Sequence, residues 1–176
     1  MRNIVLSFCR MNPPTIGHQT HIDACKNIAS LCSGELYIHL SKSKDKKNPL
    51  DYASKLRIIK ECNQDIADSF LDIPEVTDPF KMLKHHSQKD GETINLWIVV
   101  GDDRLNEFRD KFHKYNGSEF NFNFIVVLSS GIRTEKISGT VAREHIKNDE
   151  FVEFSQISMQ HDHIEQVFDY CKFHMK

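Results

Sequence analysis

The chain has 176 residues and a mass of 20.5 kDa, and 39% of its residues are hydrophobic and 27% charged. This length and composition predict one globular domain, residues 1–176, with a full core. The net charge of −2, from 23 basic and 25 acidic side chains, argues against nucleic acid as a partner. No apolar run approaches the roughly 20 residues of a membrane span, and no secretory pattern precedes the first strand. We therefore expect a cytoplasmic protein, in the host cytoplasm if the source is viral.

The cysteines and histidines favour neither disulfides nor a zinc site. The chain has five cysteines, an odd number, and no Cys-x-x-Cys pair, which predicts free thiols in a reducing compartment. Cys9 has no neighbouring histidine in the sequence, so we interpret it as a small buried residue and not as a nucleophile. The pairs His85-His86 and His161-x-His163 lack further ligands at zinc spacing.

Strand and helix patterns alternate along the chain. In order, they predict a strand at 3–9, a helix at 17–32, a strand at 35–41, a helix at 50–65, a short strand at 70–73 and a helix at 79–89. The second half gives a strand at 94–100, a helix at 104–113, a strand at 122–128, and helices at 139–148 and 164–172. Helical spacing is clear in the first helix, where Ile22, Cys25 and Ala29 share one face.

This alternation predicts an α/β fold with a Rossmann-like open parallel sheet of about five strands and helices on both faces. Near-continuous apolar strands, such as the one that contains Trp97, fit a sheet covered on both sides, and we expect Trp97 in the core. The strand ends near residues 9, 41, 101 and 129 then lie at one edge, where open α/β sheets bind ligands.

The most informative segment joins the first strand to the first helix and reads Asn12-Pro13-Pro14-Thr15-Ile16-Gly17-His18. Gly17 has no side chain to block an approaching anion, and a helix start offers unpaired N–H groups and the positive end of the helix dipole. Thr15 and His18 add a hydroxyl and an imidazole. Taken alone, the pattern is equally typical of an ordinary strand–helix turn.

A second segment of this kind, Lys136-Ile137-Ser138-Gly139-Thr140-Val141-Ala142-Arg143, opens a helix after the last strand. Ser138 or Thr140 can cap that helix, and Gly139 lets phosphate approach its N–H groups. Arg143, one turn further, can bind phosphate oxygens with its guanidinium. The plain alternative is a helix cap with Arg143 on a solvated face. Two such helix starts at one sheet edge predict a site for a polyphosphate.

Two other segments also have a plain and a functional interpretation. The Lys-rich loop (residues 42–47) is either solvated or closes over phosphate with Lys46 or Lys47. The carboxylates of Asp102 and Asp103 either cap the next helix or take part in the site.

These residues resemble the nucleotidyltransferase superfamily, which has a (T/H)xGH motif after strand one and an ISxTxxR motif late in the chain. Here the two motifs read Thr15-Ile16-Gly17-His18 and Ile137-Ser138-Gly139-Thr140-Val141-Ala142-Arg143. Gly101-Asp102-Asp103 resembles the GxD element of the family, and the run at 46–50 is similar to that of small stand-alone members carried by tailed bacteriophages. Cys9 and Arg10 depart from the pattern, since many members have a glycine there that lets the backbone lie close to the nucleotide or second substrate.

The resemblance implies transfer of a nucleoside monophosphate, from ATP or CTP, to a phosphorylated small-molecule acceptor with release of pyrophosphate. Acceptors in the superfamily include nicotinamide mononucleotide, phosphopantetheine, sugar or polyol phosphates and phosphocholine. The GxD-like element and the Asn-Pro-x-Thr-x-Gly-His opening favour nicotinamide mononucleotide. Mg²⁺ would bridge the phosphate oxygens. The implied catalytic residues are Thr15, His18, Lys47 and Arg143. The implied nucleotide-binding residues are Phe8, Cys9, Arg10, Asn12, Gly17, Gly101, Asp103, Arg104, Ile137, Ser138, Gly139 and Thr140.

The resemblance also implies particular roles. His18 and Thr15 would bond the α-phosphate, while Ser138, Thr140 and Arg143 would hold the β- and γ-phosphates. Asp103 would contact the ribose or shape the acceptor site.

Other classes of function are less well supported. A nucleotide-binding sensor module without turnover is the main alternative. A fragment of a class I aminoacyl-tRNA synthetase lacks room for an anticodon domain, and a P-loop kinase is excluded because GxxxxGK[ST] is absent. The oligomeric state stays open.

Overall fold

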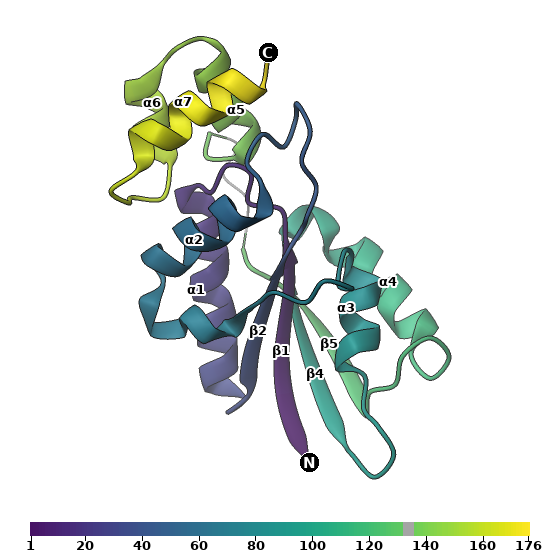
Figure 1. Cartoon of the computed structure of the whole chain (residues 1–176). Helices are drawn as coiled ribbons and strands as arrows, with labels where there is room; N and C mark the ends of the chain where they lie inside the picture. Colours follow the sequence, from purple (N-terminus) through teal and green to yellow (C-terminus); the bar gives the residue numbers. More distant parts are fainter. Residues whose placement is uncertain (132–135) are drawn as a thin grey trace. The chain divides into compact units, whose positions relative to one another are not determined.

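Helices and strands alternate through most of the structure, a computed structural model that describes residues 1–131 and 136–176. The elements, in chain order, are β1 (Arg2–Cys9), α1 (Ile16–Leu31), β2 (Glu35–Leu40), α2 (Tyr52–Cys62), the 3-10 helix η1 (Gln64–Ser69), β3 (Phe70–Leu71), α3 (Pro79–His86), β4 (Ile94–Val100), the 3-10 helix η2 (Asp102–Arg104), α4 (Leu105–Tyr115), β5 (Phe124–Ser129), α5 (Gly139–Lys147), α6 (Phe151–Ile157) and α7 (Ile164–His174) (Figure 1). In the described residues, no helix is both long and apolar enough to cross a membrane.

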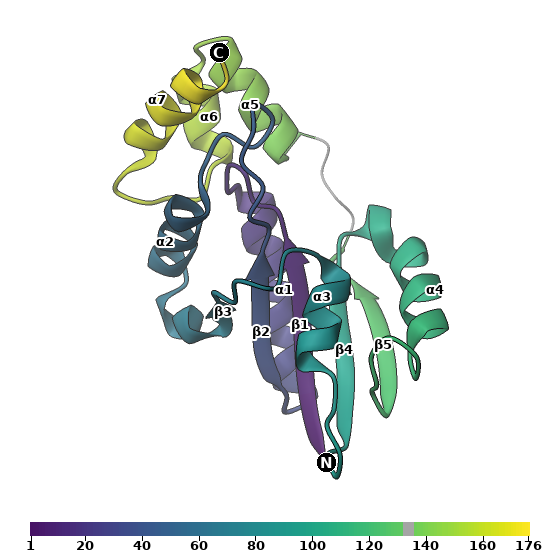
Figure 2. The same cartoon turned by 45° about the vertical axis from the view of Figure 1, so that its right-hand side comes forward.

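The strands form one sheet in the order β3-β2-β1-β4-β5, in which β3 has only two residues and the others six to eight (Figure 2). β1 pairs with β4 in parallel, with Arg2 opposite Ile94, and β4 pairs with β5 in parallel, with Asn95 opposite Phe124. The predicted Rossmann-like α/β fold is therefore confirmed.

Alternate residues of β1 face different helices. Leu6 lies in a core that includes Leu83 of α3 and Phe112 of α4. Ser7, one residue on, faces the other side, where its hydroxyl is 2.7 Å from the imidazole of His21 in α1. Because neighbouring strand residues point to opposite faces, these contacts place helices on both faces, as predicted.

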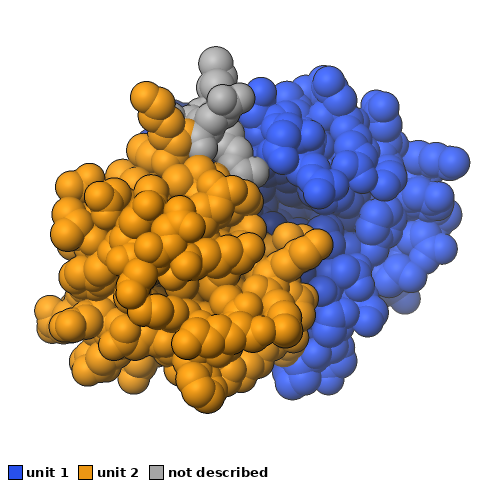
Figure 3. All heavy atoms as spheres, turned by 90° about the horizontal axis from the view of Figure 1, so that it is seen from above, with its two compact units in different colours: residues 1–9, 21–39, 71–133 blue, residues 10–20, 40–70, 134–176 orange. Residues whose placement is uncertain are grey.

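The chain divides into two compact units, coloured separately in Figure 3. Unit 1 comprises residues 1–9, 21–39 and 71–133 and contains most of the sheet with α3 and α4. Unit 2 comprises residues 10–20, 40–70 and 134–176. It has its own core, formed by Leu50, Ile58, Ala142, Ile146, Phe154, Val167, Phe168 and Cys171. The organisation as one domain stays a prediction.

Some predicted bounds and one predicted burial were wrong. The helix predicted at 50–65 begins only at Tyr52, because the Asp51 carboxylate accepts the Ser54 N–H (2.8 Å) and caps it. The seven-residue α6 was not predicted, since so short a helix has little periodicity to detect. Trp97 is only half-buried, because the residue on which its ring packs edge-to-face (5.0 Å between centroids) is Phe124, itself exposed on the edge strand β5.

Candidate active site

Thr15 forms the start of helix α1. Its carbonyl oxygen accepts hydrogen bonds from the N–H groups of His18 (2.8 Å) and Gln19 (3.1 Å). The residue is completely buried and pairs with Ser158 through an isolated β-bridge. Thr15 therefore belongs to the framework that fixes the first helical turn.

The imidazole of His18 is fixed by this same residue. Its Nδ1 accepts the backbone N–H of Thr15 (3.0 Å) and lies 2.9 Å from the Thr15 hydroxyl oxygen. A backbone N–H can only donate, so Nδ1 carries no proton, and a neutral ring then carries its proton on Nε2. The cap thus prepares His18 as a hydrogen-bond donor through Nε2. The Thr15 hydroxyl, which the resemblance assigns to the α-phosphate, supports the histidine in this structure.

The second predicted helix start is α5, and its cap is Ser138. The Ser138 hydroxyl accepts the N–H of Val141 (3.2 Å), which decides between the two predicted caps. Thr140 has another contact, since its hydroxyl oxygen accepts Nη2 of Arg143 (3.0 Å). In α-helices the first amides lack an intrahelical acceptor, and here these include the amides of Gly139 and Thr140.

The two helix starts lie next to each other within unit 2. A Cβ atom added to Gly17 would be 2.8 Å from the carbonyl oxygen of Ile137, and one added to Gly139 would be 3.8 Å from Cε1 of His18. Nη1 of Arg143 donates to the carbonyl oxygen of Asn12 (2.7 Å). The glycine at position 17 is therefore required by the close approach of the Ile137 backbone.

Asn12 connects this site to the end of the Lys-rich loop. Its Nδ2 donates to the carbonyl oxygen of Leu50 (2.9 Å), and its Oδ1 accepts the Leu50 N–H (3.0 Å). The side chain is buried. Its amide both donates to and accepts from the backbone of Leu50, which is the pattern that a paired β-strand would provide. Asn12, which the resemblance places among the nucleotide-binding residues, joins two protein segments through its side chain.

The Lys-rich loop is exposed but well bonded. Asp45 accepts the N–H of Lys47 (2.7 Å) and both its oxygens accept the amide of Asn48. The ammonium of Lys44 donates to the Tyr170 hydroxyl (3.1 Å), and that of Lys46 to the Lys176 carbonyl oxygen (2.6 Å). Lys47 projects from this ordered turn as an exposed side chain.

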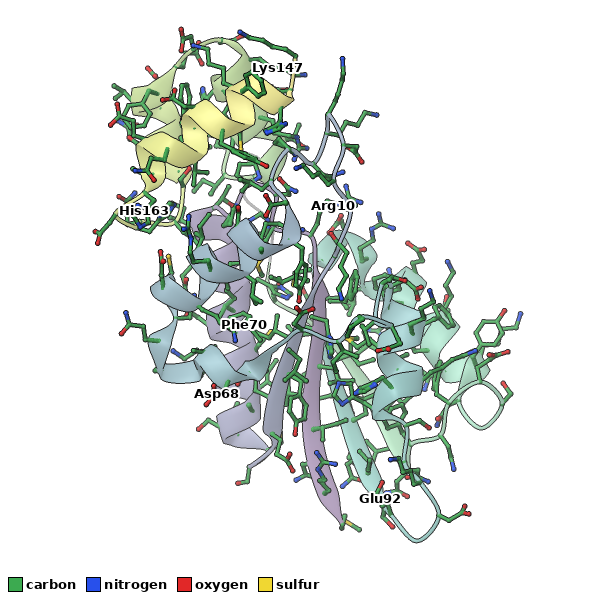
Figure 4. The ribbon with its side chains drawn as sticks, in the orientation of Figure 1. Arg10, Asp68, Phe70, Glu92, Lys147 and His163 are labelled. Atoms are coloured by element: carbon green, nitrogen blue, oxygen red, sulfur yellow. The ribbon has the colours of Figure 1, made fainter. Side chains whose placement is uncertain are left out.

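Lys55 was missed by the sequence analysis. It lies in α2 with no exposed surface, and its Nζ contacts the backbone carbonyls of Arg10 (3.3 Å) and Ser41 (2.5 Å). Burial, reinforced by the positive charge of Arg10, lowers the pKa of Lys55 to about 8, against the opposing effect of Asp51. Arg10 itself is exposed where the chain leaves β1 (Figure 4).

Phe8 and Cys9, also predicted as nucleotide-binding residues, belong to unit 1. Phe8 packs against the core of that unit. The Ser7 hydroxyl lies 3.3 Å from Sγ of Cys9 and 2.7 Å from Nε2 of His21. Burial raises the pKa of the Cys9 thiol, but the charge of His21 and the hydrogen bonds from His21 and Ser7 together outweigh burial and lower that pKa. A histidine thus does lie near Cys9, brought there by the second turn of α1.

The GxD-like segment is also in unit 1 and forms the short helix η2. In the described residues no side chain caps η2 or α4, so the capping interpretation of Asp102 and Asp103 was wrong. Asp102 accepts the Ser129 hydroxyl (2.9 Å), and Arg104 bonds Glu107 (3.0 Å). The Asp103 carboxylate fits against Gly101, where an added Cβ would be only 2.7 Å from its Oδ1.

Comparison with known proteins adds a likeness in fold. No protein-family model matches the chain, and no curated protein matches it significantly. Among solved structures, the chain is similar to a protein of Vibrio parahaemolyticus provisionally assigned as a nicotinate-nucleotide adenylyltransferase. The TM-score is 0.57 with 16% sequence identity, and the match covers 97% of this chain and 99% of the other. The two proteins therefore share a fold over nearly their whole lengths.

Proposed function

We propose that this chain is a nucleotidyltransferase that transfers AMP from ATP to a phosphorylated small-molecule acceptor and releases pyrophosphate. The observation that carries the proposal is the contact between the two helix starts of unit 2. Gly17 packs on the carbonyl of Ile137, and Arg143 bonds the carbonyl of Asn12. Each helix start presents N–H groups and the positive end of its dipole, so one polyphosphate can interact with both.

The chemistry of these groups suits in-line transfer. A phosphate oxygen of the acceptor attacks the α-phosphorus of ATP, a new P–O bond forms, and the bond to the bridging β-phosphate oxygen breaks to release pyrophosphate. Negative charge develops on the α-phosphate and on the leaving oxygen, so the chain needs positioned donors rather than a covalent nucleophile. In this proposal Nε2–H of His18 donates to the α-phosphate, while Arg143 and the start of α5 hold the leaving phosphates.

Mg²⁺ enters the proposal as part of the triphosphate substrate. Among residues 1–131 and 136–176, no group of three His, Cys, Asp or Glu side chains could hold a metal ion. The ion would therefore be bound by phosphate oxygens and water, which is the usual preference of Mg²⁺, and would offset phosphate charge. The chain would supply the neutral and cationic donors of His18, Ser138, Thr140 and Arg143.

Lys47 and Arg10 keep supporting roles in the proposal. Lys47 is exposed in its turn, and its ammonium would reach the phosphates of the bound triphosphate when the Lys-rich loop lies over them. Arg10, exposed just after β1, would line the nucleotide site.

Nicotinate or nicotinamide mononucleotide is the acceptor that we propose first. The Vibrio protein of similar fold is provisionally assigned as a nicotinate-nucleotide adenylyltransferase. The Thr15-Ile16-Gly17-His18 opening favours an acceptor of the same chemical class. Both compounds carry the 5′-phosphate that the reaction requires as its nucleophile.

Pyrophosphate release tests the function. The purified chain is incubated with Mg²⁺, ATP or CTP, and one of nicotinate mononucleotide, nicotinamide mononucleotide, phosphopantetheine, glycerol 3-phosphate or phosphocholine. We expect pyrophosphate with one acceptor, together with the matching adenylylated product by mass spectrometry. Binding of a non-hydrolysable ATP analogue without turnover on any acceptor would indicate a nucleotide-binding module instead. No binding of either triphosphate at millimolar concentration would overturn the proposed site.

A further inference from the structure

Lys55 is a buried cation held by two backbone carbonyls. Its side chain has no exposed surface, and its Nζ donates to the carbonyl oxygens of Ser41 (2.5 Å) and Arg10 (3.3 Å). All three residues belong to unit 2. Placing an amine in the protein interior is costly, so the contacts that it makes there need an explanation.

The two carbonyls come directly after neighbouring strands. β1 ends at Cys9 and β2 at Leu40, and the two strands are adjacent in the sheet. Arg10 and Ser41 follow the strands, so the carbonyls of these residues take a donor from outside the regular ladder. A methionine could fill the space of Lys55 without the desolvation cost, but it would offer no donor to either carbonyl. Even a neutral lysine amine has two N–H groups, enough for both.

The segments that start at these carbonyls carry the proposed phosphate-binding groups. The segment from Arg10 leads to His18, and the segment from Ser41 leads through the Lys-rich loop to Leu50. A second link joins Asn12, two residues after Arg10, to Leu50 at the far end of the loop, through reciprocal bonds between the Asn12 amide and the Leu50 backbone. Both ends of the loop are thus bonded to the start of the segment that carries His18, one through Lys55 and the other through Asn12.

We propose that Lys55 is a positioning residue of the nucleotidyl-transfer site, which binds the carbonyls of Arg10 and Ser41 and so fixes the segment that carries His18 against the loop that carries Lys47. Lys55 acts on the protein backbone, so it needs no contact with a substrate. The consequence for catalysis rests on the proposed function, whereas the link between the two segments can be tested without it.

Amide hydrogen exchange tests the link. Lys55→Met is compared with wild type and with Lys60→Met, a matched change on the half-exposed side of the same helix. In Lys55→Met we expect peptides covering 10–15 and 41–50 to lose at least about tenfold in protection, while those of α5 and α7 stay within about twofold. Lys60→Met should match wild type. Unchanged protection in Lys55→Met would overturn the proposal.

A measurement on the wild type covers the case in which Lys55→Met does not fold. In protein labelled with ¹⁵N-lysine, the ζ-protons of Lys55 should exchange with solvent at least about tenfold more slowly than those of Lys60, because they are buried and hydrogen-bonded. Equal exchange rates for the two lysines would contradict the buried link.

The effect of Lys55→Met on catalysis is measured as kcat, calculated per folded molecule. Displacing His18 by about an ångström is expected to cost roughly 10- to 100-fold in kcat, with the KM for ATP changed by less than about threefold. Lys55→Arg, which keeps the donors, should recover most of the loss. A kcat equal to wild type in folded Lys55→Met would refute the positioning role. Absence of activity in the wild type would instead count against the proposed function, and the exchange experiment would still decide the link.

Discussion

Nη1 of Arg143 lies 2.7 Å from the carbonyl oxygen of Asn12, a residue 131 positions earlier in the chain. A second guanidinium nitrogen, Nη2, donates to the hydroxyl of Thr140 (3.0 Å). The guanidinium is therefore fixed in orientation by its own protein. Such preorganisation lowers the entropic cost of binding an anion.

Replacing Arg143 should weaken triphosphate binding more than it weakens the fold. Arg143→Ala removes the charge and two hydrogen bonds, so we expect at least a tenfold loss in affinity for a non-hydrolysable ATP analogue and a decrease of about 1–2 kcal/mol in the free energy of unfolding. Titration calorimetry and urea unfolding measure the two effects. Arg109→Ala, at an exposed position of α4, is the control. Unchanged affinity in Arg143→Ala would exclude this residue from phosphate binding.

His18 should matter for turnover and much less for binding. Loss of one transition-state donor in His18→Ala is expected to lower kcat by about 100-fold or more, with ATP-analogue affinity within about fivefold of wild type. Pyrophosphate release under saturating substrates gives kcat. His113→Ala, on the exposed face of α4, should behave as wild type. A normal rate in His18→Ala would remove the imidazole from the mechanism.

Thr15 should act through His18. Thr15→Val keeps the shape of this buried side chain but removes the hydroxyl 2.9 Å from Nδ1, while the backbone N–H remains. We expect kcat to fall about fivefold, which corresponds to roughly 1 kcal/mol for one hydrogen bond. Thr15→Ser should retain most of the rate. In His18→Ala, adding Thr15→Val should have no further effect on kcat; additive losses would show that Thr15 acts independently.

The two glycines should differ in their tolerance of alanine. In Gly17→Ala the new Cβ would be 2.8 Å from the backbone oxygen of Ile137, which cannot move easily. In Gly139→Ala the nearest atom is Nη1 of Arg143 at 3.3 Å, at the end of a flexible side chain. We expect Gly17→Ala to lower the free energy of unfolding by about 1–3 kcal/mol, and Gly139→Ala by less than about 1 kcal/mol. Urea unfolding decides the order, and a reversed order would contradict the described packing.

The pair formed by buried His39 and half-buried His86 should make stability depend on pH. The two Nε2 atoms are 2.9 Å apart, and burial, with the charges of His39, His85 and Arg2, lowers the pKa of His86 from 6.5 to about 3. Between these values the unfolded chain binds a proton that the folded chain does not. The free energy of unfolding therefore falls as the pH drops below about 6.5, by up to roughly 1.4 kcal/mol per pH unit.

The slope between pH 7 and 4.5 tests this linkage. Urea unfolding of His86→Gln should show a shallower loss of stability towards acid than wild type, since the titrating group is gone. His113→Gln removes an exposed histidine and should leave the slope unchanged. Equal slopes for wild type and His86→Gln would contradict the assignment.

The sequence predicted the fold and the pairing of the helix starts for one physical reason. Parallel strands joined through helices bring all their carboxyl ends to one edge, so glycine-containing helix starts after two strands are expected to meet. Residue types alone limited the N-cap of α5 to two candidates, Ser138 and Thr140, because the hydroxyl of either residue can accept a backbone N–H at a helix start.

The directions of individual side chains could not be obtained in this way. Thr15 and Asn12 have residue types suited to a ligand, yet their polar atoms are used by His18 and Leu50. These contacts depend on the path of an irregular loop, which no periodicity describes. The contact of Cys9 with the Ser7–His21 pair likewise depends on how α1 lies against β1.

Lys55 did leave a signal in the sequence. It stands three, four and seven residues before Ile58, Ile59 and Cys62, so it lies on the apolar face of its helix. A lysine on such a face is buried only when its ammonium has hydrogen-bond or ion-pair partners, so its position predicts a specific contact.

The anchoring of the Lys-rich loop at both ends has a consequence for how such proteins can diversify. The carbonyl of Ser41 is bonded to Lys55, and the backbone of Leu50 to the Asn12 amide, so the ends of the loop are set independently of its tip. Residues 43–47 are exposed, and insertions there would alter reach and charge while leaving both anchor points in place. The tip can therefore be exchanged while both anchor points of the loop stay in place.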